Sequence, residues 1–405
     1  MARLGIDFGT SNTGAGILRD GRPTALPLEA GAQTLPTAVF VDFTDKRFVY
    51  GEAAARAMME GQDGRFMRGL KSILGTPLAR EKRRFLNERM TLIEVIGRFL
   101  AEIRCRSERI TGQSFEAAIS GRPVRFHSES EDKDAQAEID LREAYALAGF
   151  RAVDFLPEPE AAALAVAGEG RMLIVDIGGG TSDFTLCERA RGQTRVIASR
   201  GLRLGGTDFD RSLSLAHVMP LLGHGAEIGA ELGAKTHAAP RALFHDLASW
   251  EKIAFVYDAA LLREVKRWIR LARDPVLFER LAEVLEMHLG HDIAYAVEAG
   301  KIAANDAERG EIALDVVQRG LRIDLWGVQL QHELSSAAAR IGDMALATLK
   351  DGGCRPDQVD MVVFVGGSSQ LSGVRQALAR RLPEARQETA EVFTAVVHGL
   401  AFAAR

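Results

Sequence analysis

Residues 173–183 read Leu-Ile-Val-Asp-Ile-Gly-Gly-Gly-Thr-Ser-Asp, an apolar run followed by a glycine turn between two acids. Three consecutive glycines give up much chain entropy on folding, so an ordinary structural turn does not favour them. Because Gly178, Gly179 and Gly180 carry no β-carbon, the backbone there can approach a polyphosphate closely. The flanking carboxylates are hard oxygen ligands of the kind that suit hydrated Mg²⁺. The stretch therefore predicts a strand hairpin that binds phosphate.

A related stretch begins the chain. Residues 4–14 read Leu-Gly-Ile-Asp-Phe-Gly-Thr-Ser-Asn-Thr-Gly, with the same order of strand, acid, apolar residue, glycine and small-residue turn. The turn offers N–H groups and hydroxyls to phosphate oxygens, and Asp7 could orient water on a divalent cation. A plain hairpin turn explains this stretch, taken alone, equally well. Few residues are identical in the two copies, but copies in the two halves of a chain are what a duplicated two-lobe fold leaves behind.

Two further glycine sites follow. The first, Gly205-Gly206-Thr-Asp-Phe-Asp, precedes a helical stretch, where backbone amides can face a phosphate. The second, residues 361–369, is an apolar strand that ends in Gly-Gly-Ser-Ser before a helix. An α/β sheet presents its backbone to a nucleotide in this way at its carboxyl edge. Either site alone would be an ordinary loop, but together with the two hairpins they predict a nucleotide site.

The composition is that of an ordinary globular protein. The 405 residues suffice for two compact lobes, and 47% of them are hydrophobic and 26% charged. A formal net charge of −4 argues against broad electrostatic binding to nucleic acid. Three widely spaced cysteines predict reduced thiols. No apolar run approaches the ~20 residues that cross a bilayer, and no signal region is evident, so we expect a cytoplasmic protein without a membrane partner.

Strand-length apolar runs alternate with helical periodicity along the chain, which predicts an α/β architecture. The segments with helical periodicity are 92–103, 138–148, 276–289 and 328–349. The strand-like runs are 4–8, 38–42, 117–120, 173–177, 184–187 and 361–365.

Two other sets of polar residues have more than one interpretation. Glu158 lies between two prolines, at the junction of a strand with the following helix. Its carboxylate could accept a proton or order a water, and it could equally be an acid favoured by the helix dipole. Glu298, Lys301 and Asn305 fall at i, i+3 and i+7 and so share one helix face. A solvated ion pair is the usual meaning of such spacing.

Together, these motifs resemble the nucleotide-binding domain of the seventy-kilodalton heat-shock chaperones, the DnaK type. Residues 175–183 are similar to that family's second phosphate loop almost letter for letter. The other matching segments are 5–13, 70–75, 156–164, 204–210, 298–301 and 366–368. They occur in the family's order from residue 4 to about residue 400. The resemblance implies an α/β protein with the actin-like ATPase fold, a ribonuclease H-like duplication with two lobes and a central nucleotide cleft.

The resemblance also implies roles for single residues. Lys71 would neutralise charge on the γ-phosphate in the transition state, Glu158 would orient the attacking water, and Thr181 would lie beside the γ-phosphate. The implied catalytic residues are Lys71, Glu158, Asp176, Thr181 and Asp183. The residues implied to hold Mg²⁺, with K⁺ as a further candidate, are Asp7, Asp176 and Asp183. The implied ATP-binding residues are Gly9, Thr10, Ser11, Asn12, Gly178, Gly179, Gly180, Gly205, Gly206, Glu298, Lys301, Asn305, Gly366, Gly367 and Ser368.

The sequence departs from the family's pattern at several positions. Gln370 stands where the family has an Arg stacked on adenine, and Asn305 stands where a Ser is typical. Residues 391–394, Glu-Val-Phe-Thr, replace a polar lead into the last helix. Gln370 and Phe393 in particular lower the adenine affinity that we expect, more than they affect phosphate chemistry. Because the chain stops after a helix at 394–405, we expect no peptide-binding domain, as in the truncated, YegD-like branch.

The expected domains are lobe I, residues 1–170 with a peripheral subdomain at 36–115, and lobe II, residues 171–405 with one at 215–300. We expect a slow ATPase that forms ADP and phosphate and acts as a chaperone-like switch on a protein partner of unknown identity. A small-molecule kinase of the same fold, with Asp208 as its base, and an actin-like filament former are the alternatives. The retained Lys71 and Glu158 argue against a protein that binds ATP without hydrolysing it.

Overall fold

A computed structural model describes residues 2–165, 169–191, 193–230, 236–389 and 394–404. Contacts divide the chain into two compact units, of which unit 1 comprises Met1–Gly206 with Ala337–Arg405 and unit 2 comprises Thr207–Ser336. Both glycine hairpins lie in unit 1. The lobe boundary expected at residue 170 falls inside unit 1 and remains a prediction. Among the described residues, no helix combines the length and the apolar character needed to span a bilayer.

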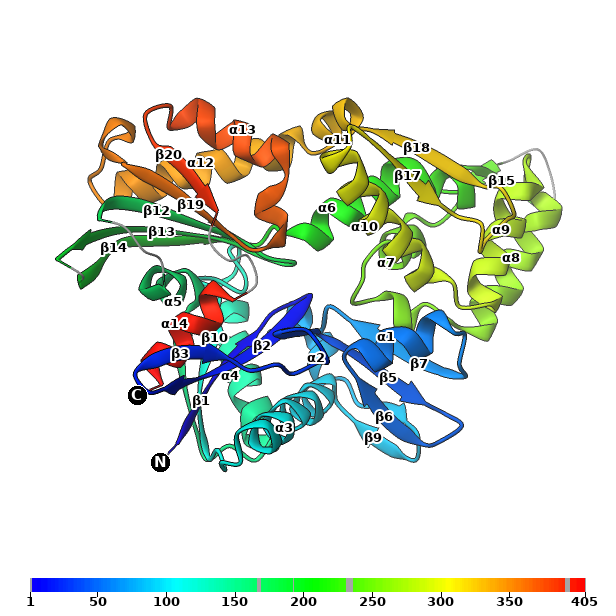
Figure 1. Ribbon diagram of the computed structural model, residues 1–405. Coiled ribbons are helices and arrows are strands. Elements are labelled where there is room, and N and C mark those ends of the chain that lie inside the picture. The colour runs from blue at the N-terminus through cyan, green and yellow to red at the C-terminus, as the bar shows by residue number, and fades with distance from the viewer. Residues whose placement is uncertain (1, 166–168, 192, 231–235, 390–393, 405) are drawn as a thin grey trace. The chain divides into compact units, whose positions relative to one another are not determined.

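Unit 1 contains two large sheets with the same strand order (Figure 1). The first sheet consists of β11 (Ala152–Pro157), β10 (Ala117–Arg122), β1 (Arg3–Phe8), β2 (Asn12–Arg19) and β3 (Arg22–Ala25), with β4 (Thr34–Pro36) paired to β2. The second consists of β20 (Arg386–Thr389), β19 (Met361–Val365), β12 (Gly170–Ile177), β13 (Ser182–Ala190) and β14 (Gln193–Leu202). In each sheet, three consecutive strands form an antiparallel meander and two later strands add in parallel. The faint sequence echo is therefore the trace of a repeated sheet.

The helices of unit 1 repeat in the same way. The helices around β10 and β11 in the chain are α3 (Leu92–Thr111), α4 (Glu131–Leu147) and α5 (Glu158–Ala165). Those around β19 and β20 are α12 (Ser335–Asp351), α13 (Ser372–Arg381) and α14 (Ala395–Ala403). Each half thus reads meander, helix, strand, helix, strand, helix, which is the duplicated α/β pattern that we expected.

The core of unit 1 lies where α5 and α14 pack beside the two sheets. The central strands β12 and β19 are almost continuous buried apolar runs, as strands covered on both faces are. One cluster joins Ala161, Ala162 and Ala163 of α5 to both central strands and to α14. Small residues allow this close approach, because a β-carbon on Gly5 of β1 would lie 2.8 Å from the backbone nitrogen of Ala401.

The remaining elements of unit 1 are small. A three-stranded sheet is formed by β6 (Arg47–Tyr50), β5 (Ala38–Asp42) and β7 (Gly64–Arg68), beside α1 (Glu52–Met59). They are followed by a 3-10 turn (Leu70–Ile73), α2 (Pro77–Arg80) and the hairpin of β8 (Arg83–Phe85) with β9 (Glu88–Met90). Two more 3-10 turns, Pro356–Gln358 and Gly367–Gln370, flank β19.

Unit 2 is mainly helical. It is reached through α6 (Gly206–Leu213), which continues as a π-helical turn (Ser214–Val218) and a 3-10 turn (Met219–Leu222). Its helices are α7 (Arg241–Leu247), α8 (Ala259–Leu271), α9 (Pro275–Glu286), α10 (Gly290–Asp306) and α11 (Gly327–Glu333), with a 3-10 turn at Ile253–Phe255. Its strands form two hairpins, β15 (Glu227–Gly229) with β16 (Thr236–Ala238) and β17 (Arg309–Ala313) with β18 (Arg322–Trp326). Trp250, Ile253 and Ala294 pack together in its interior.

All four segments predicted as helices differ in extent: α3 continues past 103 to Thr111, α9 ends at Glu286 before 289, and the other two differ for local reasons. The segment 328–349, predicted as one helix, is broken at Leu334 into α11 and α12. The Ser335 hydroxyl donates to the carbonyl of His332 at 2.6 Å, a local bond that competes with the helical ladder. In turn, α4 begins seven residues before the predicted 138, because Ser130 caps it and acidic residues fill its first turn.

Candidate nucleotide site

The first hairpin places Asp7 near the end of β1, directly opposite Gly14 of β2. The turn between the two strands is tight: a β-carbon on Gly9 would lie 2.3 Å from the carbonyl oxygen of Asn12. Its shape is held from outside by the N–H of Thr37, which donates to the carbonyl of Ser11 at 2.9 Å. Glycine is therefore required at position 9 for the backbone to close.

The second hairpin brings its two acids together. Asp176 on β12 and Asp183 on β13 are cross-strand partners, so their side chains share one end of the sheet. The N–H of Gly178 donates to the carbonyl of Thr181 at 3.0 Å and closes the glycine turn. The Thr181 side chain and the N–H of Val124, at 2.7 Å, both hydrogen-bond to the Asp183 carboxylate.

The two hairpins meet at their turns. A β-carbon on Gly179 would lie 2.5 Å from the Ser11 hydroxyl oxygen and 3.1 Å from the β-carbon of Thr10. A β-carbon on Gly180 would lie 3.0 Å from the hydroxyl oxygens of both Thr10 and Ser72. The glycines thus allow backbone from one hairpin to reach hydroxyls of the other, as a phosphate shared between them would require.

A buried ion pair lies beside this meeting point. Lys71, in the 3-10 turn after β7, places its Nζ 2.5 Å from Oε1 of Glu158, the first residue of α5. The two residues are only 6% and 8% exposed. Asp140 of α4, fully buried, accepts from the N–H of Gly75 at 2.8 Å and so fixes the turn that follows Lys71. Residues 87 positions apart in the chain therefore form one charged centre.

Four buried carboxyl groups, Asp7, Glu158, Asp176 and Asp183, surround the single ammonium of Lys71, so their negative charges are only partly neutralised. Burial and the neighbouring Glu158 raise the pKa of Asp7 to about 7 and that of Asp183 to about 8. Burial and Glu158 also raise the pKa of Asp176 well above its ordinary value. Burial lowers the pKa of Lys71, but the charges of Glu158 and Asp7 outweigh it, and the net shift is upward. Each shift is what one ammonium among several buried carboxylates should produce.

This donor set fits a hydrated divalent cation. Mg²⁺ usually keeps several of its waters and takes one or two carboxylates, and the two hairpins supply three, Asp7, Asp176 and Asp183. A cation there would offset the charge that now raises their pKa values. Within the described ranges, no group of three or more His, Cys, Asp or Glu side chains is arranged to ligate an ion directly.

The other two glycine sites pack against the second hairpin. A β-carbon on Gly205 would lie 2.6 Å from the carbonyl oxygen of Gly179, and one on Gly206 would lie 2.5 Å from the Ser368 hydroxyl. Gly366 has a φ of +79°, and its β-carbon would lie 2.7 Å from an Asp176 carboxylate oxygen. The sites 205–206 and 366–368 thus converge with residues 178–180 at the carboxyl ends of β12 and β19.

Comparison with protein families agrees with this arrangement. Residues 3–229, more than half of the chain, match the family described as Hsp70 protein. The chain belongs to the Hsp70 family. It therefore has the actin-like ATPase fold, in agreement with its mixed α/β sheets, and at the level of the family it is an ATP-binding, chaperone-like ATPase. Hsp70 proteins use ATP with Mg²⁺ and bind protein clients; membership of the YegD-like branch stays a prediction.

Three of the ATP-binding residues implied by the Hsp70 resemblance, Glu298, Lys301 and Asn305, lie on α10 in unit 2. Lys301 is buried there, with its Nζ 2.6 Å from Oδ1 of Asp210, and the Trp250 indole N–H donates to the other oxygen at 3.1 Å. Burial is the main cause that raises the pKa of Asp210, and the charge of nearby Glu298 raises it further. The Asn305 side chain donates to Asp306 at 3.0 Å. Lys301 thus forms a buried ion pair with Asp210, whereas the spacing usually indicates a solvated pair on the helix face, and contact of this face with ATP remains a prediction.

The positions at which the sequence departs from the Hsp70 pattern have structural partners where they are described. The Gln370 side chain accepts from Nη2 of Arg375 at 2.7 Å, and that guanidinium lies 4.8 Å from the ring centroid of Phe364. Phe393 lies outside the described residues.

Asp208, the candidate kinase base, is 3.6 Å from Arg211.

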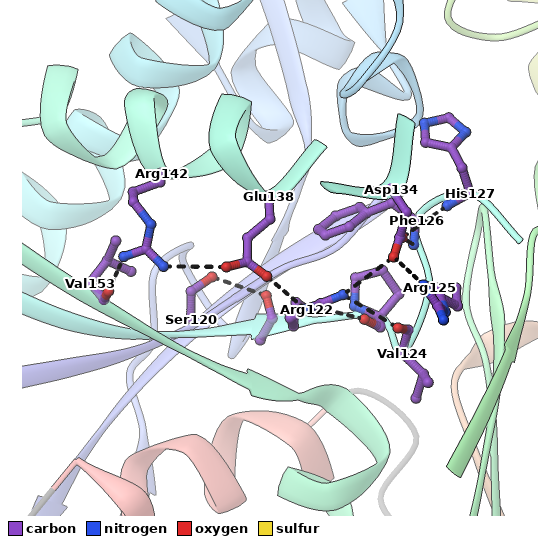
Figure 2. A network of polar contacts seen from close by, with 12 residues as sticks. Ser120, Arg122, Val124, Arg125, Phe126, His127, Asp134, Glu138, Arg142 and Val153 are labelled. Carbon is purple, nitrogen blue, oxygen red and sulfur yellow. Dashed lines mark hydrogen bonds and ion pairs between the residues drawn. The ribbon is translucent and has the colours of Figure 1, made fainter. Parts of the chain in front are cut away.

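Figure 2 shows how α4 holds the segment between β10 and α4, which contacts the second hairpin through Val124. Asp134 accepts from the backbone N–H groups of Phe126, at 2.6 Å, and His127, at 3.3 Å. Glu138 accepts from Arg122 at 2.6 Å. Two residues after Arg122, the backbone N–H of Val124 donates to the Asp183 carboxylate. By holding this segment, α4 therefore supports an acid of the site.

Two contributors to the site carry no short-range signal in the sequence. Asp140 is one of many acids on a helix, and its role appears only because α4 packs against the turn after Lys71. Arg203, two residues before the Gly205–Gly206 pair, directs its guanidinium to the carbonyl of Gly180 at 2.9 Å. A basic residue beside a predicted phosphate loop was the one available clue.

Proposed function

We propose that this Hsp70 protein is a slow ATPase switch, in which Lys71 and Glu158 carry out the chemistry beside the two glycine hairpins. The observation that supports the proposal most strongly is the buried Lys71–Glu158 pair, 2.5 Å apart, beside the carboxylates of both hairpins. A charged pair that takes no part in chemistry seldom stabilises a protein enough to explain its burial.

The proposed roles of Lys71, Glu158 and Thr181 follow from the charges of their side chains and from their positions beside the glycine turn. The Lys71 ammonium would donate to a γ-phosphate oxygen and neutralise charge that develops during transfer. The Glu158 carboxylate would then accept from the attacking water and orient it. Thr181 and the N–H groups of the glycine turn would hold the γ-phosphate in line. When bound, Mg²⁺ would supply charge neutralisation on the phosphate oxygens.

The same pair gives a reason for slow turnover. In this geometry Glu158 offsets part of the Lys71 charge and its Oε1 is occupied, so the pair has to loosen before Lys71 acts fully on the phosphate and Glu158 on the water. Opening a buried pair costs free energy, which adds to the barrier of every cycle. Slow hydrolysis suits a switch, because the long-lived ATP form can act on a protein partner before phosphate leaves.

ATP turnover with Mg²⁺ and K⁺ tests the proposal. We expect Lys71→Met and Glu158→Gln to lower the single-turnover rate by about 100-fold or more while ADP still binds. Lys252→Met is the matched control, because Lys252 forms a 2.7 Å pair with Asp246 in which both side chains are about half exposed. Full activity in both site variants would refute the assignment, and a wild type that neither binds nor hydrolyses ATP would refute the function. Repeating the assay with Na⁺ in place of K⁺ decides whether potassium contributes.

A further inference from the structure

Arg203 connects three segments of unit 1 that are distant in sequence. Its guanidinium donates to the carbonyl of Gly180 at 2.9 Å and to the carbonyl of Ser72 at 3.5 Å. Its backbone N–H donates to the Ser128 hydroxyl at 3.1 Å. The side chain thus extends from the end of β14 to the 3-10 turn that carries Lys71 and to the glycine turn of the second hairpin.

The two carbonyls that Arg203 binds are adjacent in sequence to two of the proposed catalytic residues. Ser72 directly follows Lys71, and Gly180 directly precedes Thr181. A planar guanidinium with several N–H groups in fixed directions can hold two carbonyls at a set separation, which a lysine ammonium cannot do equally well. The contact therefore sets the distance between the Lys71 turn and the glycine turn.

The same guanidinium lies in the wall of a small cavity. Thr10, Lys71, Gly180, Thr181 and Arg203 all line it, and its volume is about 10 Å³. That is room for roughly one water molecule and is too little for a phosphate group. Arg203 therefore lies at the same hollow as Lys71 and Thr181, where the rigidity of the walls affects how Lys71 meets a γ-phosphate.

We propose that Arg203 is a positioning residue of the ATPase site, which ties the Lys71 turn to the glycine turn of the second hairpin through the carbonyls of Ser72 and Gly180. This inference rests on the proposed function, because it assigns Arg203 a role in the step that Lys71 performs. Arg203 acts through Lys71 and Gly180, and its expected effect is on the rate of hydrolysis more than on nucleotide affinity.

The test compares Arg203→Met, which keeps much of the stem but removes the charge and the donors, with Arg203→Lys, which keeps the charge. Arg195→Met is the control, because Arg195 is also on β14 but is 75% exposed and pairs only at the surface with Glu188. We expect both Arg203 variants to lose about 10- to 100-fold in single-turnover rate, with the Kd for ADP within about twofold of wild type.

A second measurement separates this inference from the proposed function. Hydrogen exchange in the nucleotide-free protein reports on the Lys71 turn directly, through the N–H groups of Ser72 and Leu74. Arg203→Met should speed their exchange by about fivefold, the effect of losing roughly one hydrogen bond, and Arg195→Met should not. If the wild type hydrolyses no ATP, the proposed function falls, and the exchange result still decides the positioning role.

Two results would overturn the positioning role. One is unchanged exchange in Arg203→Met, since the contact would then not hold the turn. The other is full recovery of the rate by Arg203→Lys, since charge alone would then account for the effect of Arg203. Loss of rate in both variants with unchanged ADP binding and faster exchange supports it.

Discussion

Replacing Gly399 with alanine tests the packing that keeps α5, and with it Glu158, in place. Gly399 lies in α14, and a β-carbon there would be 1.8 Å from the carbonyl oxygen of Ala161 and 2.3 Å from its carbonyl carbon. Both atoms belong to the backbone of α5, so no side-chain rotation relieves the overlap. Because both helices pack in the core of unit 1, the strain cannot be passed to solvent.

The expected loss of stability follows from this geometry. Ordinary contact between such atoms requires about 3.4 Å, so the two helices must separate by roughly 1.5 Å. Overpacking of this kind costs about 3 kcal/mol, and alanine returns about 1 kcal/mol of helix propensity. A net loss of about 2 kcal/mol corresponds to a fall of about 4–8 °C in the unfolding midpoint of a domain of this size.

Thermal unfolding and ATP turnover measure the two consequences. Gly342→Ala is the matched control, since the nearest atoms to the β-carbon there would belong to the side-chain guanidinium of Arg381 in α13, at 2.5 Å, and not to backbone. We expect the control to lose less stability than Gly399→Ala, because a side chain can move at the cost of its hydrogen bonds, such as the one to Asp343. Gly399→Ala should unfold earlier and hydrolyse ATP about tenfold more slowly, because α5 begins with Glu158. A Gly399→Ala midpoint within about 1 °C of wild type would refute the reasoning.

Two further predictions concern other parts of the chain. Asp210→Asn should destabilise unit 2 by about 3–5 kcal/mol in denaturant unfolding, because it leaves the Lys301 ammonium buried without its anionic partner. Adding Lys301→Met should recover most of that loss, and a single variant as stable as wild type would contradict the prediction. Cys105, which is exposed, should react with iodoacetamide in the folded protein. Cys187 should react only after unfolding, because it is fully buried and burial raises its pKa to about 11; rapid modification of Cys187 in the native state would show that β13 opens.

The two glycine hairpins could be predicted from sequence because their signal is local. Three glycines between two acids within residues 173–183 define a turn whose conformation depends on few other residues. The register of β12 with β13 then places Asp176 opposite Asp183, which strand alternation and a short turn already imply. The α/β class was equally accessible, because periodicity along the chain reports burial directly.

The predicted face of Glu298, Lys301 and Asn305 shows where such reasoning stops. Helical spacing places these residues on one side of α10, as expected. Whether that side meets solvent, a ligand or another side chain depends on what packs against it, and for Lys301 the answer is Asp210. The break between α11 and α12 has a similar cause, since a single serine hydroxyl redirects the backbone where the hydrophobic pattern continues.

The sequence by itself determined the two glycine hairpins, the acids that flank them, their order along the chain and hence the family. Only the tertiary structure decided which distant side chains complete the site. Lys71 meets Glu158 because the turn after β7 lies beside the start of α5, and the Ser72 and Gly180 carbonyls share Arg203 because β14 ends beside both turns. Such pairings depend on the packing of whole sheets and helices, whereas a glycine turn depends only on its own backbone angles.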